Sequence, residues 1–305
     1  MEKKPDVTVS VLYYYSFEEY LQKNDRTLSL LTSTHNTYIW KTFQNIGIPS
    51  VFLALDAITG GLQNSNLIIV ASRPSVGKTA FAQNIVRNAA VDYNIPVAFF
   101  SLEMSSLQFA TRMMRSEAKL NKLYFEGGRT LTEEEYAQLE SHFAGLSGAP
   151  LYIDDTSGIK LFDFHEKAEN LVDKKGVRLI VIDYLQLMCG QEELRDQRDK
   201  EVAFITRTLK FTAKELNIPI IALSQLSRIP GTNKGGRPEH SQLRESGAIE
   251  EVADSIILIH RPDFMGLSDN QEDREKCISI VAKKTEMGNF ARFLHVGRWP
   301  HNGAR

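Results

Sequence analysis

The sequence contains little cysteine, no long hydrophobic run and no excess of charge of one sign. Cys189 and Cys277 are its only cysteines, which excludes a disulfide framework and a cysteine-based zinc site. No apolar stretch approaches the roughly 20 residues that a membrane-spanning helix requires. The start MEKKPDVTVSVLYYY lacks the pattern of a signal peptide. We therefore expect a soluble protein without a membrane segment, located in the reducing cytoplasm.

The formal net charge of -2 excludes a surface that is basic overall. Any contact with nucleic acid would then depend on local loops or an inner rim. With 42% hydrophobic and 24% charged residues, the composition is typical of a globular protein with a sizeable core. A length of 305 residues permits one large α/β domain or two smaller domains.

The first part of the chain, residues 1–47, differs from the rest. It carries the aromatic-rich stretch YYYSFEEY and the polar stretch TSTHNTY, without repeats or low complexity. Two interpretations are open: an arm or linker that packs on something else, such as a neighbouring subunit, or a strand and a helix of the same core. We assign these residues to an arm or linker.

From Val51 onward, short β-branched runs alternate with longer segments of helical periodicity. Strand-like runs cover residues 67–72, 96–103, 150–155, 178–188, 218–225, 255–261 and 278–284. Helix-like segments cover residues 79–93, 106–120, 133–146, 164–175 and 201–216. Near-continuous apolar runs indicate strands that are buried on both faces and covered by helices. The alternation predicts an α/β fold with a mainly parallel central sheet, whose ligands bind at the carboxyl ends of the strands.

Residues 72–79, SRPSVGKT, fit the phosphate-binding loop, with Ser72 where the pattern has its first Gly. Gly77 lets the backbone approach a phosphate, Lys78 would reach the β/γ-phosphates of ATP, and the Thr79 hydroxyl would bind Mg²⁺. A chance Gly-Lys-Thr at a helix start is the alternative, but the position at a strand-to-helix junction favours phosphate binding. The predicted ATP-binding residues are Ser72, Arg73, Pro74, Ser75, Val76, Gly77, Lys78, Thr79 and Ala80.

Three further polar residues stand at the ends of strand-like runs. Asp183 ends RLIVID and would hold the metal; otherwise it is a helix cap or a turn residue. Glu103 in FFSLEMSS would activate water; otherwise it is a surface carboxylate before a helix capped by Ser105. Gln225 ends IIALSQ, and its amide would sense the γ-phosphate. Polar residues at the ends of several strands, beside a phosphate loop, favour a nucleotide site.

The motifs ASRPSVGKTAF, FSLEMS, LIVIDYLQLM, ALSQLSR and LRESGAIEEVAD occur in this order. In this combination the sequence resembles the ATPase domain of replicative DNA helicases of the DnaB type, a branch of the RecA-like P-loop NTPases. The resemblance covers roughly residues 48–296, so we assign residues 48–305 to a RecA-like ATPase (helicase motor) domain. It implies ATP hydrolysis with Mg²⁺, movement along single-stranded DNA and self-association into a ring-shaped hexamer.

The resemblance also implies roles for the matched residues. Lys78 and Thr79 would contact the phosphates and Mg²⁺, and Asp183 would be the metal-side carboxylate. Glu103 would polarise the attacking water, and Gln225 would couple the γ-phosphate to DNA. The predicted DNA-binding residues are Arg228, Lys234, Arg237, Arg244, Glu245 and Gly247.

The segment from Arg228 to Gly247 is Gly-rich, and its first part carries basic residues without an acid before Glu239. Such a loop can follow phosphates without reading bases; a solvated surface loop is the alternative. The mixed-charge segment 191–210 corresponds to the family's other central loop. Ion pairs along a solvated helix explain its composition equally well, so we assign no site there.

Two features depart from the family pattern. Family members place a Lys and an Arg two residues apart, and these reach the neighbouring subunit's nucleotide. Here Lys283 matches the catalytic Lys, but Thr285 stands in place of the finger Arg. Such an Arg contributes on the order of 10³ or more in turnover, so either Lys283, Lys284 or Arg292 substitutes or hydrolysis is weak. About 50 amino-terminal residues also leave no room for the family's additional helical domain, which leaves a primase or loader partner open.

These observations favour a DNA helicase motor that hydrolyses ATP and unwinds duplex DNA at a replication fork. A regulatory or assembly ATPase of the same fold, which binds nucleotide without unwinding, is the second hypothesis, and Thr285 favours it. A recombinase-like filament is the third, and the LRESGAIEEVAD block argues against it.

Overall fold

The computed structural model describes residues 47–50, 52, 55–56, 59–117, 132–133, 140, 145–191, 194, 197–226, 247–260, 276–284 and 290–298, the last two ranges as backbone only. Strands are β1 (Leu67–Ser72), β2 (Val97–Ser101), β3 (Leu151–Asp154), β4 (Leu179–Asp183), β5 (Ile220–Gln225), β6 (Ser255–His260), β7 (Lys276–Lys284) and β8 (Phe290–Arg298). Helices are α4 (Lys78–Arg87), α5 (Ser106–Glu117), α8 (Leu161–Lys175), α9 (Arg198–Glu215) and α10 (Gly247–Val252). Helical turns at Asn88–Asp92 and Leu185–Leu187 complete the described elements.

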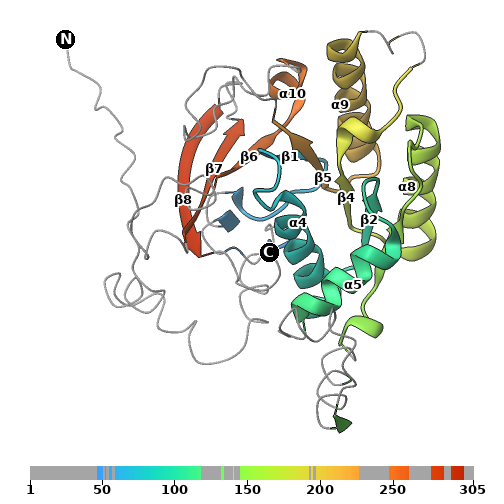
Figure 1. The fold of residues 1–305 in the computed structure, drawn as a ribbon. Coiled ribbons are helices and arrows are strands. Elements are labelled where there is room, and N and C mark those ends of the chain that lie inside the picture. Colours follow the sequence, from blue (N-terminus) through green and yellow to red (C-terminus); the bar gives the residue numbers. More distant parts are fainter. Residues whose placement is uncertain are drawn as a thin grey trace.

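The described strands form one sheet in the order β3-β2-β4-β5-β1-β6-β7-β8. The first six strands in this order pair in parallel, and β7 and β8 extend the sheet as an antiparallel edge pair. The predicted α/β fold with a mainly parallel sheet is therefore confirmed. β1 lies between β5 and β6, so the phosphate-loop segment leaves the sheet from an interior strand (Figure 1).

Each face of the parallel sheet has its own apolar layer. Along β1, Leu67, Ile69 and Ala71 pack in the cluster that includes α8, α9 and α10, whereas Ile68 and Val70 pack in the cluster with α4 and α5. Alternate side chains of a strand point to opposite faces, so a strand buried on both sides needs a continuous apolar run. This explains why β1, β2, β4 and β6 are buried over their whole length.

Several predicted boundaries need correction. The strand expected at 178–188 ends at Asp183, after which Leu185–Leu187 form a 3-10 turn. The helix expected at 79–93 leaves the α-helical pattern at Arg87 and continues as a π-helical turn. β8 was not predicted, and most of the helix expected at 133–146 lies outside the described residues.

The described chain begins at Gly47, and residues 1–46 of the predicted arm lie outside it. Ile48 is buried and pairs with Leu62 in an antiparallel bridge. Gly47 lies so close to Leu62 that an added Cβ would collide with the Leu62 carbonyl group. Ile48, Leu55 and Leu62 therefore share one apolar cluster with Ile68 and Val70 of β1.

Candidate nucleotide site

The phosphate-loop segment crosses from the end of β1 to the start of α4 with two residues in the left-handed region. Ser75 has a φ of 64° and Gly77, which caps α4, a φ of 109°. Left-handed residues within a turn direct successive N–H groups into one concavity, which suits an anion. No acidic side chain occupies the first turn of α4, so the positive end of this helix is not neutralised locally.

Lys78 and Asp183 face each other beneath this loop. The Lys78 Nζ lies 3.9 Å from the Asp183 Oδ1, and the two side chains are 11% and 1% exposed. This distance suits an ion pair but is too long for a hydrogen bond, and no donor among the described residues satisfies Oδ1. The Lys78 ammonium also lies 4.3 Å from the ring centroid of Tyr184, which supplies a cation–π contact.

Burial controls the electrostatics of this pair. It lowers the pKa of Lys78, against the opposing effects of Asp183 and Glu103. It raises the pKa of Asp183, although Lys78, the nearby Thr79 hydroxyl and Arg112 act in the opposite direction. Both charges are therefore incompletely compensated within the protein, as expected for groups that await a charged ligand.

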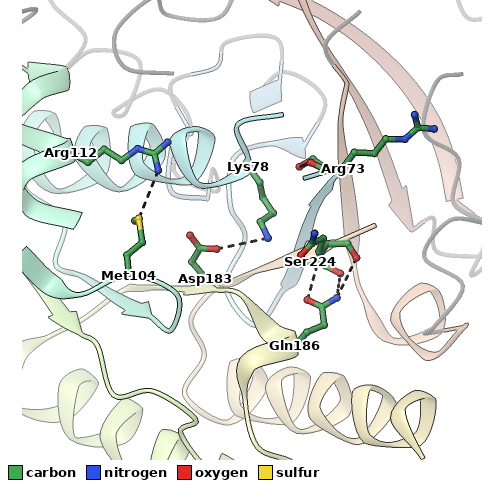
Figure 2. A network of polar contacts seen from close by, with 9 residues as sticks. Arg73, Lys78, Met104, Arg112, Asp183, Gln186 and Ser224 are labelled. Atoms are coloured by element: carbon green, nitrogen blue, oxygen red, sulfur yellow. Dashed lines mark hydrogen bonds and ion pairs between the residues drawn. The ribbon is translucent and has the colours of Figure 1, made fainter. Parts of the chain in front are cut away.

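Arg112 is a site residue that the sequence analysis missed. It lies on α5, its pKa is lowered by burial, and the carboxylates of Asp183 and Glu103 act on it in the opposite direction. Its Nη1 contacts the Met104 Sδ at 3.9 Å. Figure 2 shows Asp183 between Lys78 on one side and Arg112 with Met104 on the other. The sequence does show an Arg six residues into the helix that follows FSLEMS, but helical periodicity alone does not indicate which residue it contacts.

Glu103 lies at the exposed turn between β2 and α5, where its charge acts on Lys78, Asp183 and Arg112. The predicted cap of α5 is confirmed. The Ser105 Oγ accepts a hydrogen bond from the Gln108 N–H at 3.3 Å, and the Gln108 side chain accepts one from the Ser105 N–H at 3.0 Å. This reciprocal capping box fixes the turn that carries Glu103.

Gln225 ends β5 with an exposed residue after five buried ones. Its register partner in β1 is Ser72, the first residue of the phosphate loop. The predicted site residues of the loop, Asp183, Glu103 and Gln225 thus come from neighbouring parallel strands and meet at one edge of the sheet. Arg73 differs, because Figure 2 shows its side chain directed away from Lys78 and Asp183.

The donor set fits a divalent cation with oxygen ligands. Asp183 Oδ1 is buried without a donor, and the Thr79 hydroxyl is close enough to lower the Asp183 pKa. Within the described residues, no three His, Cys, Asp or Glu side chains form a metal cluster. Mg²⁺ is commonly held by one or two protein oxygens together with water and phosphate oxygens, so this sparse donor set suits it.

The other predicted site residues are placed only in part. Arg228, Lys234, Arg237, Arg244, Glu245 and Thr285 lie outside the described residues, and Gly247 starts α10. Lys283 lies on β7 opposite Ser255 of β6, which in turn pairs with Ile68 of β1. Since the phosphate loop leaves β1 at Ser72, Lys283 is about 13 Å along the strands from that edge.

An α/β sheet with this strand-loop-helix unit places the chain in the class of RecA-like P-loop NTPases. A family profile described as "DnaB-like helicase C terminal domain" matches residues 47–293. The chain belongs to this family. Within the described residues, no helix is long and apolar enough to cross a membrane.

Curated relatives agree with this assignment. The chain is 44% identical over 242 residues to the replicative DNA helicase DnaB of Geobacillus stearothermophilus, covering 79% of this chain and 52% of the relative. It is 39% identical over 290 residues to the replicative DNA helicase DnaC of Bacillus subtilis, covering 89% and 63%. The chain thus spans between about half and two thirds of these relatives.

Solved structures show the same fold. A structure titled "The Structure Of A DnaB-Like Replicative Helicase And Its Interactions With Primase" superposes with a TM-score of 0.76 at 28% identity, covering 91% of this chain and 68% of the other. A second structure, described as an "ATPase Domain", superposes with a TM-score of 0.74 at 29% identity, covering 89% and 95%.

Proposed function

We propose that this chain is an ATP-hydrolysing motor that moves along single-stranded DNA and unwinds duplex DNA at a replication fork. The observation that carries the proposal is the buried Lys78–Asp183 pair beneath the phosphate loop, in a chain of the DnaB-like family. A pair of charges that the protein alone does not satisfy is expected where a polyanion with its cation binds.

Each side chain at this edge has a task in phosphoryl transfer. Lys78 binds the β/γ-phosphates, while Thr79 and Asp183 hold Mg²⁺, which would neutralise charge that develops on the phosphate oxygens. Glu103 orients and polarises the attacking water, and Gln225 contacts the γ-phosphate. Arg112 supplies a second positive charge on the far side of Asp183.

We further propose that the nucleotide site is completed by another copy of the chain in a ring-shaped hexamer. Lys283 lies near the amino ends of the parallel strands, whereas the phosphate loop leaves their carboxyl ends, and Lys284 follows Lys283 further from that loop. A lysine side chain is too short to span that separation, so Lys283 would serve a neighbouring subunit. Single-stranded DNA would bind through Arg228, Lys234, Arg237, Arg244, Glu245 and Gly247.

The first test is ATP turnover with and without unstructured single-stranded DNA. Lys78→Ala is the inactive variant, and Lys174→Ala, an exposed lysine on α8, is the matched control. We expect severalfold stimulation by DNA in the unchanged and control proteins, stimulation that weakens with salt, and no turnover in Lys78→Ala. Tight ATP binding without any response to DNA, at concentrations that permit oligomers, would refute the motor.

A mixing experiment tests the shared site. Lys78→Ala and Lys283→Ala would each be inactive alone. In a ring mixed in equal parts, about a quarter of the interfaces combine an intact Lys78 with an intact Lys283, so turnover should reappear on mixing. Absence of recovery, with mixed oligomers confirmed by mass, would show that Lys283 does not act across subunits.

The second candidate is a regulatory or assembly ATPase that binds nucleotide without unwinding DNA. Thr285 at the position of the finger Arg favours it, because loss of that charge lowers turnover. Thr285→Arg distinguishes the candidates. A rise in DNA-stimulated turnover would support a motor that lacks its finger, whereas turnover that remains insensitive to DNA with the Arg in place would support the regulatory ATPase.

A further inference from the structure

The ladder between β4 and β5 stops before either strand reaches the nucleotide site. Its last paired residues are Ile182 and Ala222, and β5 continues for three residues to Gln225. Beyond the last backbone pair, a side chain makes the hydrogen bonds to β5. The Gln186 Nε2 donates to the Ser224 Oγ at 2.9 Å and to the Gln225 carbonyl at 3.4 Å, and the Gln186 Oε1 accepts from the Gln225 N–H at 3.4 Å (Figure 2).

The carboxyl end of β5 is therefore held from both sides. On one side, Gln225 pairs with Ser72, whose carbonyl accepts a hydrogen bond from the Leu226 N–H at 3.0 Å. On the other side, the Gln186 amide contacts both backbone groups of Gln225. A side-chain amide that pairs with an N–H and a C=O of one residue imitates a strand neighbour, but a single rotamer change can release it.

The same residue is tied to α9 through its backbone. The Gln186 carbonyl accepts a hydrogen bond from the Arg198 Nη2 at 2.6 Å, and the Arg198 Nη1 pairs with the Glu201 Oε2 at 2.6 Å. The buried Glu201 also accepts from the Gly190 N–H at 3.3 Å. An added Cβ at Gly190 would lie 2.6 Å from the Glu201 Cγ, so this packing requires the glycine.

These contacts make one continuous chain from the phosphate-loop edge to both ends of the segment between Gly190 and Arg198. We infer that Gln186 is a positioning residue that couples the position of Gln225 to this segment, with the Arg198–Glu201 pair as its second half. The inference rests on the proposed function, since it assigns a task to the end of β5 when nucleotide binds. It connects the end of β5 to Gly190 and Arg198, which lie next to and within the mixed-charge segment 191–210, where no site was predicted.

The test replaces Gln186 with Met, which keeps its length and removes all three hydrogen bonds. Gln186→Glu is the conservative variant, because its carboxylate still accepts from the Gln225 N–H and the Ser224 hydroxyl. Gln63→Met is the matched control, as Gln63 donates to the Gly60 carbonyl before the opposite end of β1. We expect Gln186→Met to keep the KM for ATP and the basal turnover within about twofold, and to lose at least fivefold of the stimulation by single-stranded DNA. Gln186→Glu should be intermediate and Gln63→Met unchanged.

Hydrogen exchange gives a readout besides activity. In the unchanged protein, a non-hydrolysable ATP analogue should alter exchange at both the Leu226 and Gly190 amides. In Gln186→Met the change should persist at Leu226 and disappear at Gly190. A purely structural role for Gln186 would instead raise exchange at both amides with or without nucleotide.

The outcomes distinguish failure of the proposed function from failure of the coupling. If the unchanged protein shows no stimulation by DNA, the proposed function fails, and the exchange experiment still decides the coupling. If DNA stimulates Gln186→Met as strongly as the unchanged protein and the Gly190 response persists, the inference is overturned. If Gln186→Met does not fold, Arg198→Met decides instead, because it breaks the second link without touching β5; loss of the Gly190 response supports the coupling and its persistence overturns it.

Discussion

The substitution Asp183→Asn tests whether the buried carboxylate of the nucleotide site lowers the free energy of unfolding of the protein. Asp183 is 1% exposed, and the nearest cation, the Lys78 Nζ, lies 3.9 Å from its Oδ1. At an effective dielectric constant of 20, attraction across that distance amounts to about 4 kcal/mol. Burial of a carboxylate opposes this attraction by several kcal/mol. Burial, together with the charge of Glu103, raises the pKa of Asp183 despite Lys78, Thr79 and Arg112, so the loss of hydration outweighs the attraction to Lys78.

Asn has the shape of the neutral carboxyl group and removes the buried charge. Because the pKa of Asp183 is raised with Lys78 already beside it, the ionised carboxylate is less favourable in the folded protein than a neutral group of the same shape. We therefore expect Asp183→Asn to raise the free energy of unfolding by about 1 kcal/mol, or Tm by roughly 2–4 °C. ATP turnover should fall at least a hundredfold, because the variant lacks the metal-side carboxylate. Thermal and urea unfolding in EDTA at pH 7 measure the first effect, and the ATPase assay measures the second.

The pH dependence of the free energy of unfolding tests the direction of this effect independently. A raised carboxyl pKa means that the folded state binds the proton more tightly than the unfolded state. The contribution of Asp183 to stability is thus complete below the unfolded value near 4 and is lost as pH rises through the folded pKa. The gap in stability between Asp183→Asn and the unchanged protein should therefore widen from pH 4 towards neutrality.

Asp154 at the end of β3 is the matched control. Burial alone would raise its pKa, but hydrogen bonds from Lys167 and Thr156 outweigh burial and hold the pKa below its usual range. Its contribution is present above the unfolded pKa and is lost as pH falls through the folded pKa, so Asp154→Asn should destabilise the protein at pH 7. If both variants lose stability alike, the reasoning about Asp183 is refuted.

Further substitutions test the fold around the site. Gly47→Ala should destabilise by about 1–3 kcal/mol or more, because its Cβ would collide with the Leu62 carbonyl oxygen. Gly176 has a φ of +65°, and no heavy atom lies within 4 Å of an added Cβ, so Gly176→Ala should lower the free energy of unfolding by only about 1 kcal/mol. Urea unfolding compares the two variants. Phe164→Ala should lose about 3–5 kcal/mol in the same assay, since Phe164 is fully buried and packs edge-on against Phe100. Ser105→Ala should lose about 1 kcal/mol and raise hydrogen exchange at Gln108, through loss of the capping box.

The sheet was predictable because burial on both faces leaves a local signature. β1 and β6 appear in the sequence as the unbroken runs LIIVAS and SIILIH. β8, FARFLHVGR, has two Arg residues and a His among its apolar residues, and an antiparallel edge strand does not need apolar side chains on both faces. The end of β4 was misplaced because Tyr184, Leu185 and Leu187 continue the apolar pattern after the backbone has left the sheet.

The phosphate loop and the two strand-end carboxylates were predictable because their spacing is local. Gln186 was not, because its partners are distant along the chain, and Arg112 was not, because its approach to Asp183 depends on the order of the strands. Gln186 contacts Ser224 and Gln225, 38 and 39 residues away, and nothing in DYLQLM indicates that the amide takes the place of a strand. Sequence patterns of this kind place residues on elements, whereas contacts between side chains depend on strand order and register.

Departures from local stability rules gather at the carboxyl edge of the sheet. Ser75 adopts a left-handed conformation, which costs a non-glycine residue about 1–2 kcal/mol, and the buried Asp183 Oδ1 without a donor costs roughly 1–3 kcal/mol. Among the described residues, left-handed conformations of non-glycine residues elsewhere fall on Ser65, before β1, and on Asn94 and Asn217, whose side chains tolerate them in turns. The apolar layers on both faces of the sheet offset these losses. A sequence under selection for stability alone would not retain a strained serine, a buried lysine and an unsatisfied carboxylate within one loop and the adjoining strand end. Their coincidence is explained if a nucleotide and its cation supply the missing partners, because binding then restores in the complex the free energy that the free protein lacks.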